Sequence, residues 1–259
     1  MMPEENPRIP EGINVSPSHP VKDLLLLSLG VCIAFMITAL VLWYSLTFFV
    51  RFIPLSWESR IADPIVNQFI DDSEQQIELQ QRLDKILVAM GYQGKSPIQV
   101  SVIDSAEVNA FATLGGHIFV LTGLLTELES EIGLDMVLAH EAAHILHRDP
   151  IKSATGMLGI SVVTALITGN GHFAQTSGLM NIGNHLLFLN NSREQERAAD
   201  NAALDAMMTL YGHVDGAEEL FVSLLDDDSV ELPAILSSHP HPNERIDYIR
   251  QYFKETQVK

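Results

Sequence analysis

The chain has 259 residues, of which 47% are hydrophobic, and its 33 acidic and 15 basic residues give a formal net charge of −18. This length allows one globular domain of ordinary size plus a membrane segment. A chain this acidic repels nucleic-acid phosphates, and the sequence shows no basic stripe. We therefore expect no nucleic-acid partner. The single cysteine, Cys32, excludes an intramolecular disulfide and a cysteine-based zinc site. A transition-metal site must therefore use histidines and carboxylates.

The N-terminal part of the sequence predicts a tail followed by a membrane helix. Residues 1–23 contain five prolines among scattered charges, which is typical of a short flexible tail. Residues 24–50 carry no charge, and as a helix this run would be about 40 Å long, enough to cross a bilayer core of about 30 Å. A cleaved signal peptide is the alternative. It is disfavoured because the run exceeds a signal's apolar region and no small-residue cleavage site follows it.

Basic residues flank the predicted span almost equally, with Arg8 and Lys22 before it and Arg51 and Arg60 after it. The positive-inside rule is therefore nearly balanced and decides little. A single early span followed by a large domain leads us to expect the domain, residues 51–259, on the non-cytoplasmic side of the membrane.

The remainder of the chain alternates strand-like and helical patterns. Residues 98–103 and 117–122 alternate as strands do, and between them Gly115-Gly116 suits a turn or bulge where another backbone approaches closely. Apolar residues recur at helical spacing in one longer segment, and two further segments are predicted to be helical, the first of which Pro150 should stop. The predicted helices cover residues 74–91, 131–148 and 192–210, and a shorter apolar run covers residues 157–168.

The second predicted helix contains the sequence His140-Glu141-Ala142-Ala143-His144. Residues four apart share a helix face and lie about 6 Å apart along the axis, so both imidazoles can reach one metal ion. Glu141 points in another direction but lies beside the first ligand, where it can take a proton from a water molecule. Zinc suits two histidines and a carboxylate, a set that leaves one position open. The alternative is a polar helix face with solvated histidines.

The third ligand decides the class of zinc site. The long metzincin motif needs a histidine at position 150, where this chain has Pro150. The third predicted helix offers a carboxylate instead, since Glu196 and Asp200 share one face. Glu196 can bind zinc while Asp200 accepts a hydrogen bond from a ligand imidazole and fixes its tautomer. The alternative is an exposed face paired with neighbouring arginines, but the flanking alanines favour close packing and burial.

Four sequence blocks together resemble the M48 family of metallopeptidases, which includes the CAAX prenyl proteases and the HtpX-type membrane proteases. The blocks lie in the family's order and extend over most of the domain that follows the predicted span. Only one block contains the metal-binding histidines, so the joint match is far more specific than that motif alone. The matching residues are Asn109-Ala110-Phe111-Ala112 with Gly115-Gly116, His140 to Asp149, Ser192-Arg193 with Glu196 and Ala199-Asp200, and Ser238-His239-Pro240 with Glu244-Arg245-Ile246.

This resemblance implies a mainly α fold with a small β-sheet (α+β), of the gluzincin type, with one Zn²⁺ per chain. It implies that the strand around Gly115 and Gly116 pairs with an extended peptide substrate. It also implies that Asn109 and His239 donate hydrogen bonds to the oxyanion and that Arg245 orients this site. Two alternatives stay open, in which Asn109 only satisfies a turn and Arg245 only makes a structural ion pair.

The sequence therefore predicts a membrane-anchored zinc endopeptidase that acts on protein substrates in membrane or envelope protein quality control. Glu141 would serve as the general base, so no serine or cysteine nucleophile is expected. One alternative is a zinc-binding chaperone or adaptor that holds misfolded proteins without cutting them. Another is a different metal-dependent hydrolase, which the Gly115-Gly116 block disfavours because such a strand serves extended peptides.

Overall fold

The computed structural model describes residues 19–50, 52–66, 73–155, 191–226, 235, 239 and 242–257. The chain divides into two compact units, Met1–Ser45 and Leu46–Lys259. Most of the predicted N-terminal tail and the predicted apolar run at residues 157–168 lie outside the described residues.

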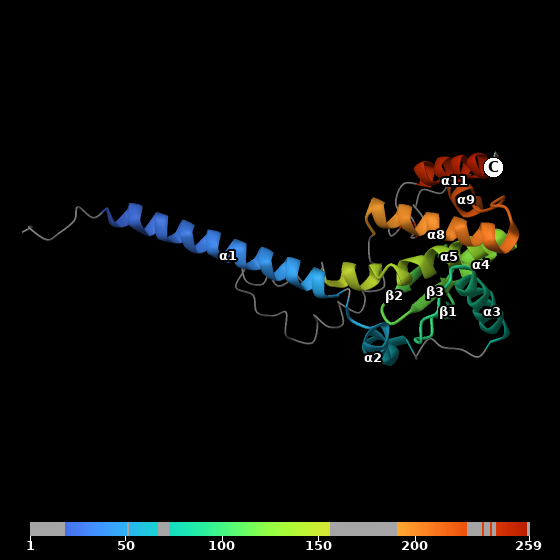
Figure 1. Ribbon diagram of the computed structural model, residues 1–259, viewed down its shortest axis with the longest axis horizontal. Helices are drawn as coiled ribbons and strands as arrows, with labels where there is room; N and C mark the ends of the chain where they lie inside the picture. Colours follow the sequence, from blue (N-terminus) through green and yellow to red (C-terminus); the bar gives the residue numbers. More distant parts are fainter. Residues whose placement is uncertain are drawn as a thin grey trace, which may run out of the picture. The chain divides into compact units, whose positions relative to one another are not determined.

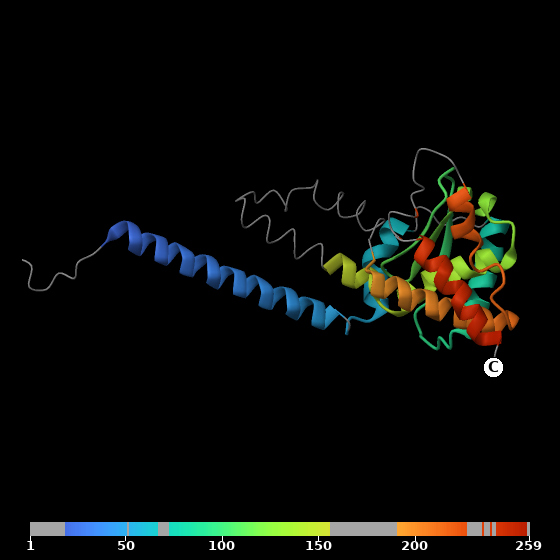
Figure 2. The ribbon, with the colours of Figure 1, turned by 90° about the horizontal axis from the view of Figure 1, so that it is seen from above.

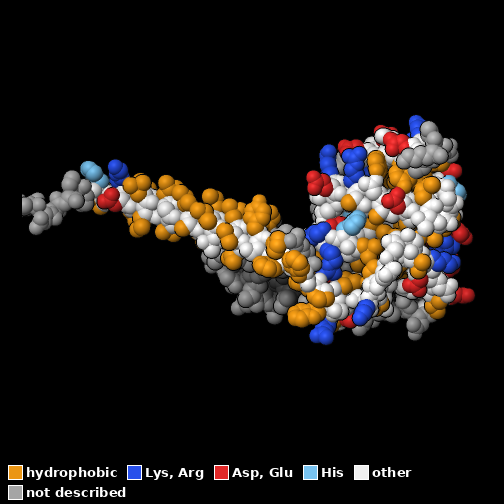
Figure 3. Space-filling view, in the orientation of Figure 1, with side chains coloured by type: hydrophobic (Ala, Val, Ile, Leu, Met, Phe, Trp, Pro, Cys, Tyr) orange, Lys and Arg blue, Asp and Glu red, His pale blue; other side chains and the backbone are white. Residues whose placement is uncertain are grey.

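Helix α1 (Pro20–Val50) makes up most of the described part of the first unit, and its last turn, from Leu46, belongs to the second unit (Figure 1). Its 31 residues correspond to a length of about 46 Å. Its most apolar window has a mean hydropathy of 2.7 and no buried residue, and apolar side chains cover it along its length (Figure 3). The hydroxyl of Thr38 donates to the carbonyl of Ala34, so this polar group is satisfied within the helix. By length and composition α1 can cross a membrane.

The second unit is built on a three-stranded sheet with the order β1-β3-β2. Strand β1 (Gln99–Ile103) pairs in parallel with β3 (His117–Leu121), and β2 (Ala110–Thr113) pairs with β3 in antiparallel. Both predicted strands are present. The third, β2, was not predicted, because its four residues lie directly before the Gly115-Gly116 turn and are too few for a clear alternation. Gly115 and Gly116 have φ angles of 82° and 84°, which glycine adopts readily and other residues avoid.

Three helices cover one face of this sheet in layers. Helix α5 (Glu131–Leu146) lies against the sheet, α8 (Arg193–Tyr211) lies on α5, and α3 (Glu74–Ala89) packs beside them against β1 (Figures 1 and 2). Further described helices are α4 (Thr122–Glu127), α9 (Glu219–Asp226) and α11 (Pro242–Gln257). Helices α9 and α11 pack on one another, and α11 packs on α8. The predicted mainly α fold with a small β-sheet is confirmed.

Serine caps set where the three principal helices begin. The hydroxyls of Ser73, Ser130 and Ser192 accept from backbone N–H groups three residues further on, and at Ser192 the side chain of Gln195 completes a capping box. Such caps are worth about 1 kcal/mol each. They explain why the predicted starts of these helices agree with the structure to within a residue.

The end of the second predicted helix differs from the expectation. Helix α5 ends at Leu146, and His147 and Arg148 form a turn in which Arg148 has a φ of 65°. Residues 149–155 are then helical again. Pro150 lies in the first turn of this segment, where its missing N–H costs nothing because that group has no intrahelical partner. The proline therefore begins a helix here and does not stop one.

The other face of the sheet is covered by helix α2 (Leu55–Val66), which the sequence did not predict. Its Ala62 and Val66 belong to a second apolar cluster with Phe111 and Phe119 of the sheet. Their neighbours in the same strands, such as Ala110, face the main core instead. Both faces of this small sheet are therefore buried, and α2 is an integral part of the second unit.

Candidate active site

Helices α5 and α8 bring the three predicted metal ligands together in the buried interior. The Nε2 atoms of His140 and His144 are 3.0 Å apart. Glu196 completes a triangle, with Oε2 3.4 Å from His140 Nε2 and Oε1 3.3 Å from His144 Nε2. Tetrahedral ligands at zinc distances of about 2.0–2.1 Å are themselves about 3.3 Å apart. The donor types and their spacing therefore fit a zinc ion.

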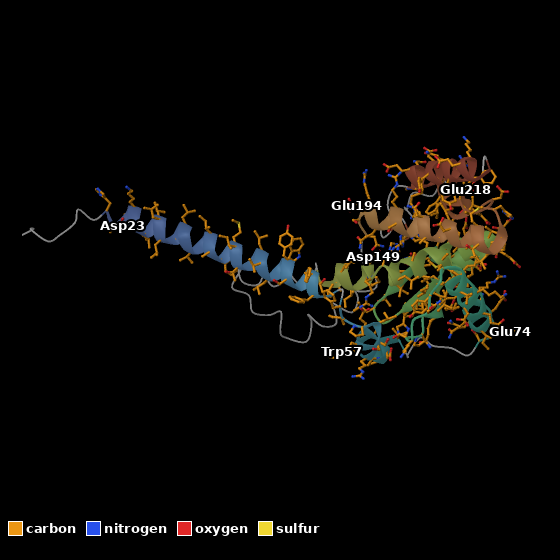
Figure 4. The ribbon with its side chains drawn as sticks, viewed as in Figure 1. Asp23, Trp57, Glu74, Asp149, Glu194 and Glu218 are labelled. Carbon is orange, nitrogen blue, oxygen red and sulfur yellow. The ribbon has the colours of Figure 1, made fainter. Side chains whose placement is uncertain are left out.

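Carboxylates hold the other ring nitrogen of each histidine. Asp200 Oδ1 lies 3.0 Å from His140 Nδ1, as the sequence predicted, and Asp149 Oδ2 lies 3.0 Å from His144 Nδ1. Each carboxylate favours the tautomer with the proton on Nδ1, which leaves the Nε2 lone pair free for a metal. Asp149 was missed as a partner of His144, although it directly follows the metal-binding helix in sequence; Figure 4 labels it just past the end of α5.

Electrostatics keep the two aspartates charged. Burial alone would raise the pKa of Asp149, but hydrogen bonds with His144, Gln195 and Lys152 outweigh this effect and hold the pKa at about 2. Burial acts in the same direction on Asp200, and the charge of Arg245 together with the bond to His140 lowers its pKa to about 2. Both groups therefore remain hydrogen-bond acceptors for the histidines at neutral pH.

Glu141 lies beside the metal donors without belonging to them. Its Oε2 accepts a 2.7 Å hydrogen bond from the backbone N–H of Ala112 in β2, and its Oε1 lies 3.3 Å from His239 Nε2. Burial would raise the pKa of Glu141, but the charges of His239, His140 and His144 outweigh it and lower the pKa. Glu141 is thus a buried carboxylate that stays ionised beside the metal donors.

His239 lies closer to the metal donors than the sequence indicated. Its Nδ1 is 3.0 Å from Glu196 Oε2 and 3.3 Å from His140 Nε2. The ligand atoms of His140, His144, Glu196 and His239 all lie within 4.8 Å of one another. Burial would lower the pKa of His239, but Glu196 and Glu141 raise it. The oxyanion role predicted for His239 stays a prediction, and the geometry adds a second candidate role as a fourth ligand.

Arg245 on α11 is buried against the same carboxylates. It makes a two-pronged contact with Asp200, with Nε to Oδ2 at 3.0 Å and Nη2 to Oδ1 at 2.5 Å, and its Nη1 lies 3.1 Å from Glu196 Oε2. Its guanidinium also lies 4.2 Å from the ring centre of Phe221. These contacts match the structural ion pair that the sequence left open as an alternative, while a role of Arg245 toward the oxyanion stays a prediction.

The residues predicted to bind substrate lie in two different places. Asn109 directly precedes β2, is fully buried, and its side chain has no hydrogen-bond partner among the described residues. Gly115 packs against α2, where its N–H donates to Glu58 Oε2 at 3.2 Å and its carbonyl accepts from Ser59 Oγ at 2.9 Å. Gly116 follows in the same buried turn. The backbone groups of Gly115 are therefore occupied, and the outer edge of β2 lies next to Glu141.

A small cavity lies between β2 and the metal donors. It has a volume of about 10 Å³, which is room for about one water molecule. Its lining includes Ala112, Glu141, His144 and Asn191. Asn191 Nδ2 lies 3.2 Å from His144 Nε2, a contact that the sequence gave no reason to expect because Asn191 precedes the cap of α8.

Comparison with known proteins gives a family for this geometry. Residues 73–252, more than half of the chain, match the sequence model of Peptidase family M48. The chain is 30% identical over 195 residues to the mitochondrial metalloendopeptidase OMA1 of Schizosaccharomyces pombe. The aligned region covers 69% of this chain and 53% of that protein. It is 26% identical over 199 residues to the beta-barrel assembly-enhancing protease of Escherichia coli (strain K12). This aligned region covers 72% of this chain and 38% of that protein.

A shorter relative is matched over more of its length. The metalloprotease LoiP of Escherichia coli (strain K12) is 26% identical over 186 residues, covering 70% of this chain and 73% of LoiP. The chain spans about half or less of the length of the two larger relatives. The family match confirms the resemblance drawn from the sequence blocks, and the chain belongs to peptidase family M48, a family of zinc metalloendopeptidases.

Proposed function

We propose that this chain is a membrane-anchored zinc endopeptidase that cleaves membrane or envelope proteins in quality control. The observation that carries the proposal is the buried triangle of His140, His144 and Glu196, with donor atoms 3.0–3.4 Å apart. A chain with solvated histidines has no need of such an arrangement. One zinc ion per chain would bind these three side chains, with His239 close enough to join them.

The chain's own residues account for the proton transfers of peptide hydrolysis. A zinc ion bound here would supply a Lewis acid and lower the pKa of water. Glu141 accepts the proton as water attacks the scissile carbonyl and then delivers it to the leaving amine. Its place beside the water-sized cavity supports this role. No acyl-enzyme forms, so no nucleophilic side chain is required.

The oxyanion needs hydrogen-bond donors that are already in place. We assign this role to His239, whose Nε2 lies 3.3 Å from Glu141, and to the amide of Asn109. The amide of Asn109 has no partner among the described residues, which supports its assignment, because a fully buried polar group without a partner is costly unless a ligand satisfies it. Arg245 supports the site by holding Asp200 and Glu196 in place.

The substrate would bind as an extended peptide along the outer edge of β2. Among the described residues this strand pairs with β3 on one side only, and the N–H of Ala112 points away from β3 toward Glu141. The backbone groups of residues two apart point the same way, so the backbone N–H and C=O of Ala110 also point toward this edge. A peptide added here gains backbone hydrogen bonds irrespective of its sequence, which suits unfolded proteins. Gly115 and Gly116 would contribute by forming the turn that sets the position of β2.

Membrane anchoring is proposed from α1, with residues 24–50 as the span and residues 51–259 as the domain on the non-cytoplasmic side. The name of the beta-barrel assembly-enhancing relative supports envelope proteins as substrates. Fusion of alkaline phosphatase after Lys259 tests the orientation, and an active reporter is expected. An inactive phosphatase, with a cytoplasm-specific reporter active at the same position, would reverse the orientation.

The activity is tested with the purified full chain in detergent. We expect the zinc-loaded protein to digest an unfolded protein such as casein, a chelator to stop the digestion, and added zinc to restore it. Zinc-loaded protein that captures unfolded casein without cutting it would replace the proposal with the chaperone or adaptor alternative. Cleavage of other bonds but not of peptides would point to a different hydrolase.

A further inference from the structure

Helix α2 reaches two separate parts of the candidate active site through one buried carboxylate. It begins at Leu55, a few residues after α1 ends at Val50. Trp57, which Figure 4 labels on α2, is exposed. The next residue, Glu58, is only 4% exposed, which is unusual for a charged side chain. Its two oxygens have different partners.

The first partner is the turn that follows the catalytic helix α5. Glu58 Oε1 pairs with the guanidinium of Arg148, which also donates to the carbonyl of Ile53. Arg148 has a φ of 65°, a left-handed conformation that residues with a side chain adopt rarely and at some cost. The ion pair explains why this turn is kept. The next residue is Asp149, which holds the ring of His144.

The second partner is the turn of the β2–β3 hairpin. Glu58 Oε2 accepts the N–H of Gly115, and the adjacent Ser59 donates to the carbonyl of the same glycine. The fit is tight, because a Cβ on Gly115 would come within 2.9 Å of Ser59 Cα. This turn ends strand β2, whose Ala112 N–H is bound to Glu141.

We infer that Glu58 is a positioning residue of the active site, acting through Arg148 on Asp149 and through Gly115 on β2. One carboxylate thereby positions both Asp149, which holds His144, and strand β2, whose Ala112 N–H binds Glu141. If Glu58 lost its charge, Arg148 would lose its ion-pair partner, and the turn before Asp149 would loosen. The segment that follows the membrane helix is then a working part of the peptidase. This inference rests on the proposed function.

The test compares Glu58→Gln with Asp135→Asn in the full-length protein. Asp135 is a matched control, because it is also buried and pairs with an arginine, Arg82, at 3.4 Å. Its other described hydrogen-bond partner is Tyr211, and neither partner belongs to the candidate site. We expect Glu58→Gln to lower kcat roughly 10–100-fold with KM within about threefold, since small misplacements of catalytic groups have effects of this size. Asp135→Asn should lower the melting temperature and leave kcat unchanged.

Two further measurements do not depend on activity. Chelator competition should show that Glu58→Gln binds zinc up to roughly 10-fold more weakly, at the lower end of the effect of a lost outer-shell partner. Hydrogen exchange should accelerate both in residues 110–113 and in residues 147–155, and in neither for Asp135→Asn. If the parent protein cuts no peptide, the proposed function fails, but zinc affinity and exchange still decide this inference.

Parent-like kcat, zinc affinity and exchange in Glu58→Gln would overturn the inference, as would acceleration confined to α2. If that variant does not fold, Ser59→Ala serves instead, because it removes the hydroxyl that donates to the Gly115 carbonyl at 2.9 Å and to the Leu55 carbonyl within α2 at 3.2 Å. It should accelerate exchange in residues 110–113 and lower kcat a few-fold, and no effect on either would contradict the role of α2.

The double variant Glu58→Gln with Arg148→Met should have a kcat no lower than the worse single variant. Additive losses of kcat would show that the two residues act separately.

Discussion

The two outer edges of the small sheet satisfy the same backbone groups in different ways. At the β1 edge, the side chain of Gln80 donates to the carbonyl of Ile98 at 3.1 Å and accepts from the N–H of Val100 at 3.0 Å. This neutral amide stands in for the peptide group of a missing strand. It seals the edge against unwanted strand pairing.

At the β2 edge, the backbone N–H of Ala112 meets a charged carboxylate instead. Its partner is Glu141, the proposed base, at 2.7 Å. A neutral amide satisfies the edge permanently, whereas a carboxylate that takes up a proton during the reaction holds the N–H less tightly. Under the proposed function, the β1 edge is closed to peptides, whereas the β2 edge joins peptide binding to proton transfer.

The largest effect is expected from removing the metal next to the β2 edge. Glu196→Gln should weaken zinc binding by more than the roughly 10–100-fold typical of a lost outer-shell partner, and activity should disappear with the metal. Glu194→Gln is the control, because Glu194 lies exposed on the same helix (Figure 4). Metal content and affinity are measured on both proteins. Parent-like zinc binding by Glu196→Gln would refute the assigned ligand set.

The next prediction compares the two edges directly. Ala112→Pro removes the N–H that binds Glu141, and Val100→Pro removes the N–H that binds Gln80. We expect Ala112→Pro to lower kcat roughly 10–100-fold. Val100→Pro should cost about 1–3 kcal/mol of unfolding free energy and leave kcat nearly unchanged. Equal losses of kcat in both variants would remove the distinction between the edges.

A smaller effect is expected at Asp149, which orients His144. Asp149→Asn keeps the size of the side chain but weakens its hydrogen bond to the imidazole. Zinc affinity should fall roughly 10–100-fold. Competition with a chelator measures this change, and Asp84→Asn on the exposed side of α3 provides a control that should bind zinc like the parent. Unchanged affinity would show that the contact does not support the ligand.

The smallest effect belongs to the sealed edge. Gln80→Ala leaves the N–H of Val100 and the carbonyl of Ile98 without their protein partner, but water can reach this edge. We expect a loss of about 1 kcal/mol in unfolding free energy, measured by denaturant titration, with peptidase activity unchanged. A large loss of activity would mean that the β1 edge also serves the reaction.

The sequence was sufficient for those parts of the site that depend on local periodicity. Spacing of four residues placed His140 with His144 and Glu196 with Asp200 on shared helix faces, because a helix fixes such geometry wherever it lies. Serine caps fix the observed starts of α3, α5 and α8, which is also a local effect. The sequence also indicated that the two helices must meet, since one supplied two ligands and the other a third.

Contacts that depend on tertiary packing were not predictable in this way. The short strand β2 forms because β3 and α5 lie beside it. The bond from Asp149 to His144 requires a turn at Arg148 that no propensity favours. The buried packing of Gly115 on α2 depends on residues more than fifty positions earlier in the chain. Each of these features is set by distant partners, which a single sequence does not reveal.

The central claim is that Glu141 is the base of the reaction and not a ligand of the metal. Glu141→Gln keeps the size of the side chain and a hydrogen-bonding group but cannot take up the proton. Zinc content and turnover should be measured on the same preparations of this variant and of His140→Ala. The account predicts full zinc content with turnover reduced by roughly 10²–10⁴-fold for Glu141→Gln, and loss of both for His140→Ala. Substantial peptidase activity in zinc-loaded Glu141→Gln would contradict it.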